Sequence, residues 1–276
     1  MTHAALIARN TFREATRDRV LAGLVIAGLV LIGFTRVVSP LAMGEGLRLT
    51  VDLGLSAISM LGLLAILMVG TNLVAKEIER KTIFNLLSRP MARPVYLIGK
   101  WAGLSAALWA VAAVLGTALW LLLAVMGNGD HGLAIAQAVY LAGLELTIIT
   151  SVAVMFSALS TPVLSALYTL GLYMAGQWSD DLRAFAEKAP GSLHALLTGA
   201  ANLVPNLPLF NMRALAAVGE TTSGTHLGLA TVYALTYCAC VLALGAAAFE
   251  SRDFKCAQRR LRHRLRGSAS RRCACG

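Results

Sequence analysis

Glu145 is the most unusual ionisable residue of the chain, because it lies in the middle of a long apolar run, YLAGLELTIITS. A charged side chain at the centre of a bilayer costs at least ~2.5 kcal/mol on insertion scales. One interpretation is that Glu145 lines a transport path or binds a proton or a cation. The alternative is that a protonated or hydrogen-bonded Glu145 ties its helix to a neighbour, with Thr147 or Ser151 as partners.

Four of the five cysteines form two Cys-Ala-Cys pairs, Cys238 with Cys240 and Cys273 with Cys275, and thiolates of this kind suit copper(I). Residues two apart on a helix point about 200° away from each other, so the first pair is predicted to be plain packing. Only the second pair, which lies in a polar tail, could bring both thiolates to one metal ion. We predict neither a metal site nor a disulfide framework.

Motifs of nucleotide and hydrolytic chemistry are absent from the sequence. Gly99 and Lys100 precede Trp101, where a phosphate-binding loop requires Ser or Thr. No His-Glu-x-x-His, Cys-x-x-Cys or Gly-x-Ser-x-Gly occurs. We therefore expect a chain that is not an enzyme by itself and binds no cofactor.

The composition is that of an integral membrane protein. Of the 276 residues 57% are hydrophobic and only 14% are charged, against roughly 25% charged in soluble domains. Six segments are apolar over lengths close to the ~20 residues that cross a bilayer. An all-α fold with six transmembrane helices is predicted, with spans at about 20–38, 53–75, 101–126, 133–159, 162–178 and 227–249.

Basic residues gather in three places, the N-terminal 19 residues, the segment 76–100 and the C-terminal tail. Loops rich in Lys and Arg stay in the cytoplasm, and an even number of spans puts all three on that side. The tail, residues 255–276, holds eight of the 24 basic residues. It is predicted to be disordered and to contact anionic lipid rather than nucleic acid.

Two further elements flank the spans. Residues 3–19 have Ala4, Ile7, Ala8, Thr11, Phe12 and Ala15 on one helical face and arginines on the other, which predicts a helix in the membrane interface. The outer loop 179–226 contains an apolar stretch, residues 193–204, that is too short to span and suits a re-entrant segment. After it, Pro205 and Pro208 forbid a continuous helix.

The segment KEIERKTIFNLLSRPMARPVYLIGK, residues 76–100, predicts a short amphipathic helix on the cytoplasmic membrane surface. Glu77 and Lys81 form a favourable i,i+4 pair, and the apolar residues 83, 84, 86 and 87 share a face. Pro90 disfavours helix at the residue before it, so this helix is predicted to end there.

This segment resembles the cytoplasmic loop of ABC-2 type transporter permeases, and within them the permeases grouped with multicopper-enzyme maturation, including that of nitrous oxide reductase assembly. The resemblance is carried by Glu77, Glu79, Thr82, Ile83, Leu86, Leu87, Ser88, Pro90, Arg93, Tyr96, Gly99 and Lys100. The outer Pro205, Asn206, Leu207, Phe210 and Arg213 are similar to theirs as well. The resemblance covers residues 1–254, and the tail from 255 to 276 has no counterpart.

The resemblance implies the membrane domain of an ATP-driven exporter in the bacterial inner membrane, multi-pass and with both termini in the cytoplasm. Two permease copies, as a homodimer, would form the pathway, and ATP and Mg²⁺ would bind to separate ATP-binding subunits. A periplasmic maturation protein would be a further partner if the copper-enzyme group applies. The implied coupling helix contains Glu77, Glu79, Arg80, Lys81, Thr82, Leu86, Leu87, Ser88, Pro90 and Arg93, with the four charged residues at its start expected to contact the ATPase.

Two other functions fit the same topology. One is a membrane assembly scaffold that needs no nucleotide, and the other is an ion-coupled carrier that uses Glu145. No recognition site for a substrate stands out in the spans.

Overall fold

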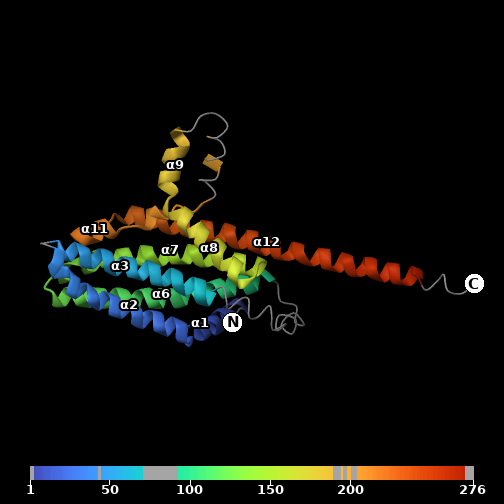
Figure 1. Cartoon of the computed structure of the whole chain (residues 1–276), viewed down its shortest axis with the longest axis horizontal. Helices are drawn as coiled ribbons and strands as arrows, with labels where there is room; N and C mark the ends of the chain where they lie inside the picture. Colours follow the sequence, from blue (N-terminus) through green and yellow to red (C-terminus); the bar gives the residue numbers. More distant parts are fainter. Residues whose placement is uncertain are drawn as a thin grey trace, which may run out of the picture.

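The computed structural model describes residues 3–42, 45–70, 93–188, 194, 198–199 and 204–270, the stretch 249–270 by the course of its backbone. Every regular element in these residues is helical. Long helices lie roughly parallel in one elongated bundle, from which the last helix projects far beyond one end (Figure 1). The all-α fold is confirmed in the part of the chain that the structure describes.

The N-terminal helix α1, His3–Thr16, packs along the first half of α6, Arg93–Val125. Gly99 and Gly103 of α6 make this contact close, because a Cβ on Gly99 would lie 2.8 Å from the Cβ of Ile7 and one on Gly103 would lie 2.7 Å from the Cβ of Thr11. Thr11 and Ala15 are buried. The apolar face predicted for this segment is therefore the face that packs, and it meets a helix of the bundle.

Two helices follow as a pair, α2, Arg19–Val38, and α3, Gly46–Ala65. Asp18 caps α2 by accepting a hydrogen bond from the backbone N–H of Val20 at 2.8 Å. A 3-10 turn, Ser39–Ala42, lies between them, and α3 continues as a π-helical turn, Ile66–Gly70. The helix begins seven residues before the span predicted from 53, because its first turns carry polar residues that hydropathy leaves out.

The central element is α7, Gly132–Leu159, which follows a 3-10 turn η3, Gly129–His131. Its apolar window is 78% buried, more than any other candidate span in the described residues. It packs against α3, α6 and α12, and glycines let the neighbours come close. A Cβ on Gly62 of α3 would lie 2.5 Å from the side chain of Leu146.

The next helix, α8, Pro162–Gln177, turns back along α7 after a break at Ser160 and Thr161, as the short connection predicts. With 16 residues it is about 24 Å long, less than the ~30 Å of a bilayer core. Five helices in the described residues are long and apolar enough to cross a membrane, and α8 is not among them. Six spans therefore stay a prediction.

The outer loop leaves the bundle and returns to it. Helix α9, Ser179–Lys188, projects sideways from the bundle (Figure 1). Residues 204–212 contain only the 3-10 turn Pro208–Phe210, as the two prolines predict, and α11, Arg213–Val218, follows. Most of the apolar stretch 193–204 lies outside the described residues.

The last helix, α12, runs from Gly224 to Ser270. Its candidate span is Gly224–Ala248, and beyond it the same helix continues away from the bundle (Figure 1). Residues 255–270 are thus helical in backbone, where the sequence predicts a disordered tail. Arg, Leu, Ala and Gln are good helix formers, and no Gly or Pro interrupts the chain between 246 and 266, so nothing local ends the helix.

Candidate functional site

Glu145 lies buried halfway along α7, with 4% of its surface exposed. Gln177, the last residue of α8, donates a side-chain hydrogen bond of 2.6 Å to its carboxylate. Ser59 of α3 lines the same small cavity as Glu145, and the side chain of Tyr173 on α8 interacts electrostatically with the carboxyl group. Helices α3 and α8 thus bring polar groups to one carboxyl group, which satisfies the need of a buried polar group for partners.

Arg213 completes this cluster from the outer loop. It begins α11, and its guanidinium donates a hydrogen bond of 3.0 Å to Oγ of Ser56, one turn of α3 away from Ser59. Its positive charge also acts on Glu145. A cavity of about 10 Å³, close to the space that one water occupies, lies between these residues and is lined also by Asn211 and Met212.

A larger polar cavity of about 560 Å³ lies on the other side of Arg213. Charged side chains of α3 line it, together with residues of the outer loop, in the set Glu45, Arg48, Leu49, Asp52, Asn211, Arg213, Ala214 and Ala217. The two cavities share Asn211 and Arg213. Arg213 therefore stands between an open polar vestibule and the buried Glu145.

The outer segment that ends in Arg213 is held by contacts with α8, α9 and α12. The backbone N–H of Asn206 donates to the hydroxyl of Tyr233 at 2.9 Å, and the hydroxyl of Ser179 donates to Asn206 Oδ1 at 3.1 Å. Phe210 is 2% exposed, with its ring centroid 6.2 Å from that of Tyr233. These contacts fix where Arg213 enters the bundle.

The structure brings together two predicted sets, Glu145 and the outer residues Pro205, Asn206, Phe210 and Arg213. Pro205 packs its carbonyl against α8, where a Cβ on Gly176 would lie 3.1 Å from it. The sequence gives no sign that the two sets meet. Ser56, Ser59, Tyr173 and Gln177 were missed, since single polar residues within spans are common. Only the packing places Ser59, Tyr173 and Gln177 near Glu145 and Ser56 beside Arg213.

The partners suggested for Glu145 from the sequence are wrong. Thr147 Oγ1 donates to the carbonyl of Gly143 at 2.7 Å and accepts from the indole N–H of Trp109 at 3.0 Å. Ser151 donates to the carbonyl of Ile148 at 2.7 Å. Both hydroxyls bond to carbonyls of their own helix, as Ser and Thr often do within helices, and both are directed away from the carboxyl group.

The predicted coupling helix lies outside the described residues, apart from its end. Arg93 is the first residue of α6. The other coupling residues, Glu77, Glu79, Arg80, Lys81, Thr82, Leu86, Leu87, Ser88 and Pro90, belong to the segment 71–92 that the structure leaves out.

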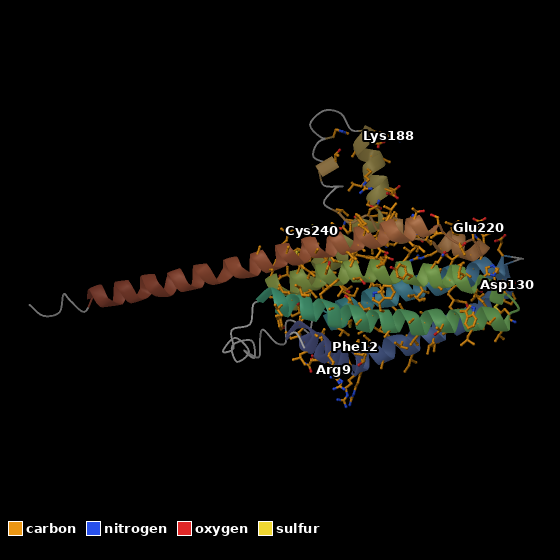
Figure 2. The ribbon with its side chains drawn as sticks, turned by 180° about the vertical axis from the view of Figure 1, so that it is seen from behind. Arg9, Phe12, Asp130, Lys188, Glu220 and Cys240 are labelled. Carbon is orange, nitrogen blue, oxygen red and sulfur yellow. The ribbon has the colours of Figure 1, made fainter. Side chains whose placement is uncertain are left out.

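The cysteines of α12 behave as the helical spacing predicts. Cys238 is buried, with its thiol 3.6 Å from the carbonyl of Thr147, while Cys240 is exposed on the far side of the helix (Figure 2). Within the described residues, no three His, Cys, Asp or Glu side chains lie close enough to hold a metal ion. Cys273 and Cys275 lie outside them.

Comparison with known proteins identifies the family of the chain. No curated protein is similar to this chain at a significant level. The sequence profile of the ABC-2 family transporter proteins, in contrast, matches residues 5–254, which include all five candidate spans and every residue of the cluster around Glu145. The chain therefore belongs to the ABC-2 transporter family, as one of its membrane components.

Proposed function

We propose that the chain is the permease subunit of an ATP-driven exporter and that its ATP-binding subunits are separate chains. The observation that carries the proposal is the family match over residues 5–254, in a protein with five membrane-length helices. The full sequence has no phosphate-binding loop, so ATP and Mg²⁺ are assigned to the partner.

The polar cluster is assigned to the transport path. Glu45, Arg48 and Asp52 would form a vestibule at the periplasmic side, and Arg213 would close it toward Glu145. The hydrogen bond between Arg213 and Ser56 joins α11 to α3, and that between Gln177 and Glu145 joins α8 to α7. A relative movement of these helices would break such bonds, so the cluster is suited to be a barrier that opens in the transport cycle.

Coupling to ATP is assigned to residues 76–90. This segment is joined in sequence to the π-helical turn Ile66–Gly70 at one end and to α6 at the other. The turn packs against α7 and α8, whose hydrogen-bonded side chains form the cluster. A displacement of the segment would therefore pull on the helices that hold Glu145, and π-helical turns often occur at such functional places.

The remaining assignments follow from the family and from the charge pattern. We place the protein in the bacterial inner membrane with both termini in the cytoplasm, as a homodimer surrounded by lipid. A role in copper-enzyme maturation, with a periplasmic protein as partner, rests on the resemblance of residues 76–100 alone.

Co-purification tests the proposal. The tagged chain is extracted from native membranes in mild detergent, and a protein with Walker motifs is expected in comparable amount by mass spectrometry. Charge reversal at two positions, Glu79→Lys with Lys81→Glu, is expected to lower its recovery about tenfold, because rim charges set partner choice. The matched control reverses Asp181 and Arg183 on α9, the same charges at the same spacing, and is expected to leave recovery unchanged.

An ATPase recovered equally with both reversed variants would contradict the coupling assignment. A chain that purifies without any ATPase would contradict the permease assignment itself.

An ion-coupled carrier is a second candidate, favoured by the buried Glu145 and its hydrogen bond from Gln177. The two functions differ in what the purified chain does alone in vesicles. A carrier would move an ion in response to a gradient, and Glu145→Gln would abolish the flux, whereas a permease subunit without its ATPase would show none.

A further inference from the structure

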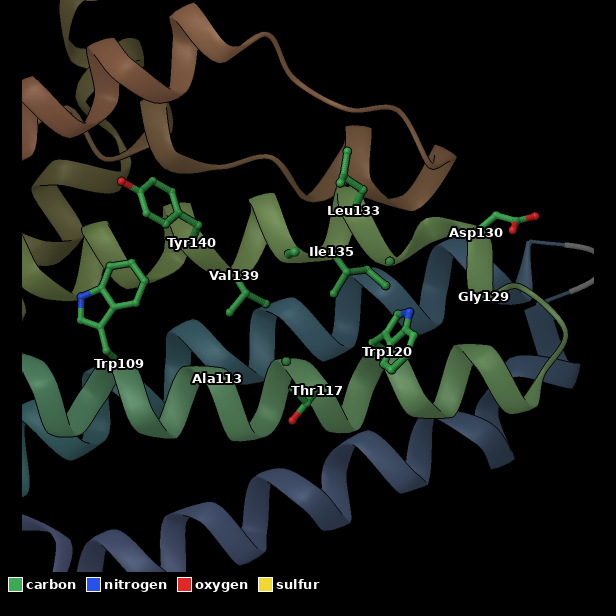
Figure 3. Close-up of a pocket in the computed structure, with 13 residues that line it drawn as sticks. Trp109, Ala113, Thr117, Trp120, Gly129, Asp130, Leu133, Ile135, Val139 and Tyr140 are labelled. Atoms are coloured by element: carbon green, nitrogen blue, oxygen red, sulfur yellow. The ribbon is translucent and has the colours of Figure 1, made fainter.

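A long apolar groove lies between α6 and α7, on the surface of the bundle and apart from the polar cluster (Figure 3). It has a volume of about 640 Å³. Small residues of both helices open it, and the lining set is Trp109, Ala113, Gly116, Thr117, Trp120, Gly129, Asp130, Gly132, Leu133, Ile135, Ala136, Val139 and Tyr140. Ala113, Thr117 and Ala136 are exposed along its length.

The floor and one end of the groove are closed by tight packing. A Cβ on Gly116 would lie 2.7 Å from the side chain of Val139, so the two helices touch beneath the groove. Trp109 and Tyr140 meet edge to face at a centroid distance of 5.4 Å and block the end near the middle of the bundle. Trp109 is held by its hydrogen bond to Thr147, and Tyr140 by one of 2.9 Å to Thr231.

The length of the groove matches one leaflet of a bilayer. From Tyr140 to Asp130 α7 and η3 run over ten residues, which gives about 15 Å at the helical rise, half of the ~30 Å hydrocarbon core. The open end lies at η3, where α7 begins and the bundle ends (Figure 3). An acyl chain that enters there would end against Trp109 and Tyr140.

Among the lining residues only Asp130 is charged, and it stands at the open end. Asp130 is exposed at the mouth, and the side chain of Trp120 reaches across the groove, so that a Cβ on Gly132 would lie 2.6 Å from its indole nitrogen. Indole rings favour the headgroup level of a membrane. A carboxylate at this level attracts an ammonium headgroup and repels an anionic one.

We infer that this groove binds one acyl chain of a phospholipid with an ammonium headgroup, taken from the leaflet at the η3 end. The chain lies along Ala113, Thr117 and Ala136, and the headgroup amine lies near Asp130. Because the groove is separate from the polar cluster, this lipid is a bound partner of the protein and is independent of the exported substrate.

Native mass spectrometry of the purified full-length protein tests the inference with two probes, dioleoyl phosphatidylethanolamine and dioleoyl phosphatidylglycerol. Wild-type protein is expected to retain one phosphatidylethanolamine per chain and to prefer it about threefold to fivefold, as an exposed ion pair would allow. Asp130→Asn is expected to remove this preference while the protein still binds one lipid.

A second variant, Ala136→Trp, fills the groove and is expected to weaken lipid retention about tenfold. The matched control is Ala110→Trp, an exposed alanine of α6 outside the groove, which should bind as wild type does. Equal retention in both tryptophan variants would overturn the inference. So would conversion of a dimer to a monomer by Ala136→Trp, measured by light scattering, since the groove would then hold a second copy of the chain.

Discussion

A carboxyl group and a guanidinium face each other across a small cavity inside this bundle, and each has a hydrogen-bond partner of its own. Gln177 donates to Glu145 at 2.6 Å, and Arg213 donates to Ser56 at 3.0 Å. The charge of Arg213 acts on Glu145 without a direct contact between them. Each side chain therefore lowers the cost of burying the other, which makes their contributions to stability interdependent.

A double-mutant cycle measures this interdependence. Glu145→Gln and Arg213→Gln are each expected to lower the free energy of unfolding by about 1–3 kcal/mol, because each leaves a buried charged or polar group less well compensated. The double variant should lose less than the sum, with a coupling of about 0.5–3 kcal/mol. The measurement is the unfolding midpoint in a denaturing-detergent titration.

The control for this cycle pairs Glu145→Gln with Thr236→Ala, an exposed residue of α12. These two changes should be additive. A coupling of zero between Glu145 and Arg213 would show that the two side chains act separately.

At the scale of residues, the sequence identified Glu145 and Arg213 but not their meeting. The sequence suggests Thr147 and Ser151, the nearest hydroxyl groups along the chain, as partners of Glu145. Both hydroxyl groups instead donate hydrogen bonds to backbone carbonyls of their own helix. The true partners come from α3, α8 and α11, so only the tertiary packing reveals them. A chain segment that is irregular because of Pro205 and Pro208 brings Arg213 into place, and no periodicity predicts where such a segment leads.

At the scale of elements, the contact of α1 with α6 depends on two glycines that leave no room for a side chain. The sequence contains the Gly99-x-x-x-Gly103 spacing, but small residues are so common in every span that spacing alone could not distinguish this contact. Gly23 and Gly33 of α2 are the opposite case, because a Cβ at either position would meet nothing within 4 Å. Packing, rather than spacing, decides which glycines are needed.

Gly103→Val is expected to separate α1 from α6, since its side chain would overlap the backbone of α1 at Ala8 and the side chain of Thr11. Overpacking of this kind costs about 1–3 kcal/mol. Limited proteolysis of the N-terminal segment should become faster in the variant. Gly33→Val is the matched control and should be cleaved as wild type is; equal cleavage of all three proteins would contradict the close contact.

The boundaries of the elements show where hydropathy succeeds and where it fails. It predicts α2 and α7 to within a residue, because their apolar stretches fill the whole helix. It begins α3 and α6 too late, since their first turns are polar but still helical. Hydropathy also predicts a span at α8, although this helix of 16 residues is too short to cross a bilayer alone. The continuation of α12 to Ser270 is not predicted by hydropathy, because the residues after the span are polar.

At the scale of the whole molecule, the two ends of the bundle differ in charge. Arg9 lies on α1, whereas Asp130 and Glu220 lie together at the η3 end (Figure 2). The positive-inside rule then predicts that the η3 end faces away from the cytoplasm. Five spans would put the termini on opposite sides of the membrane, and six would put them on the same side.

Reporter fusions at the two ends of the full chain decide between these topologies. Alkaline phosphatase is active only after export, so both fusions are expected to be inactive, because the basic residues of both ends favour the cytoplasm. Green fluorescent protein fused at the same positions is the control and should fluoresce. An active phosphatase at the C-terminus would show an odd number of spans and would contradict the proposed topology.

The most direct test of the central claim is ATP hydrolysis by the purified assembly in lipid nanodiscs. Wild-type chain with its co-purified ATPase is expected to hydrolyse ATP, and Glu79→Lys with Lys81→Glu to lower the hydrolysis measured per chain about tenfold through loss of the partner. Reversal of Asp181 and Arg183 should leave the rate unchanged. An assembly of the chain that transports its cargo without hydrolysing ATP would contradict its assignment as the membrane half of an ATP-driven transporter.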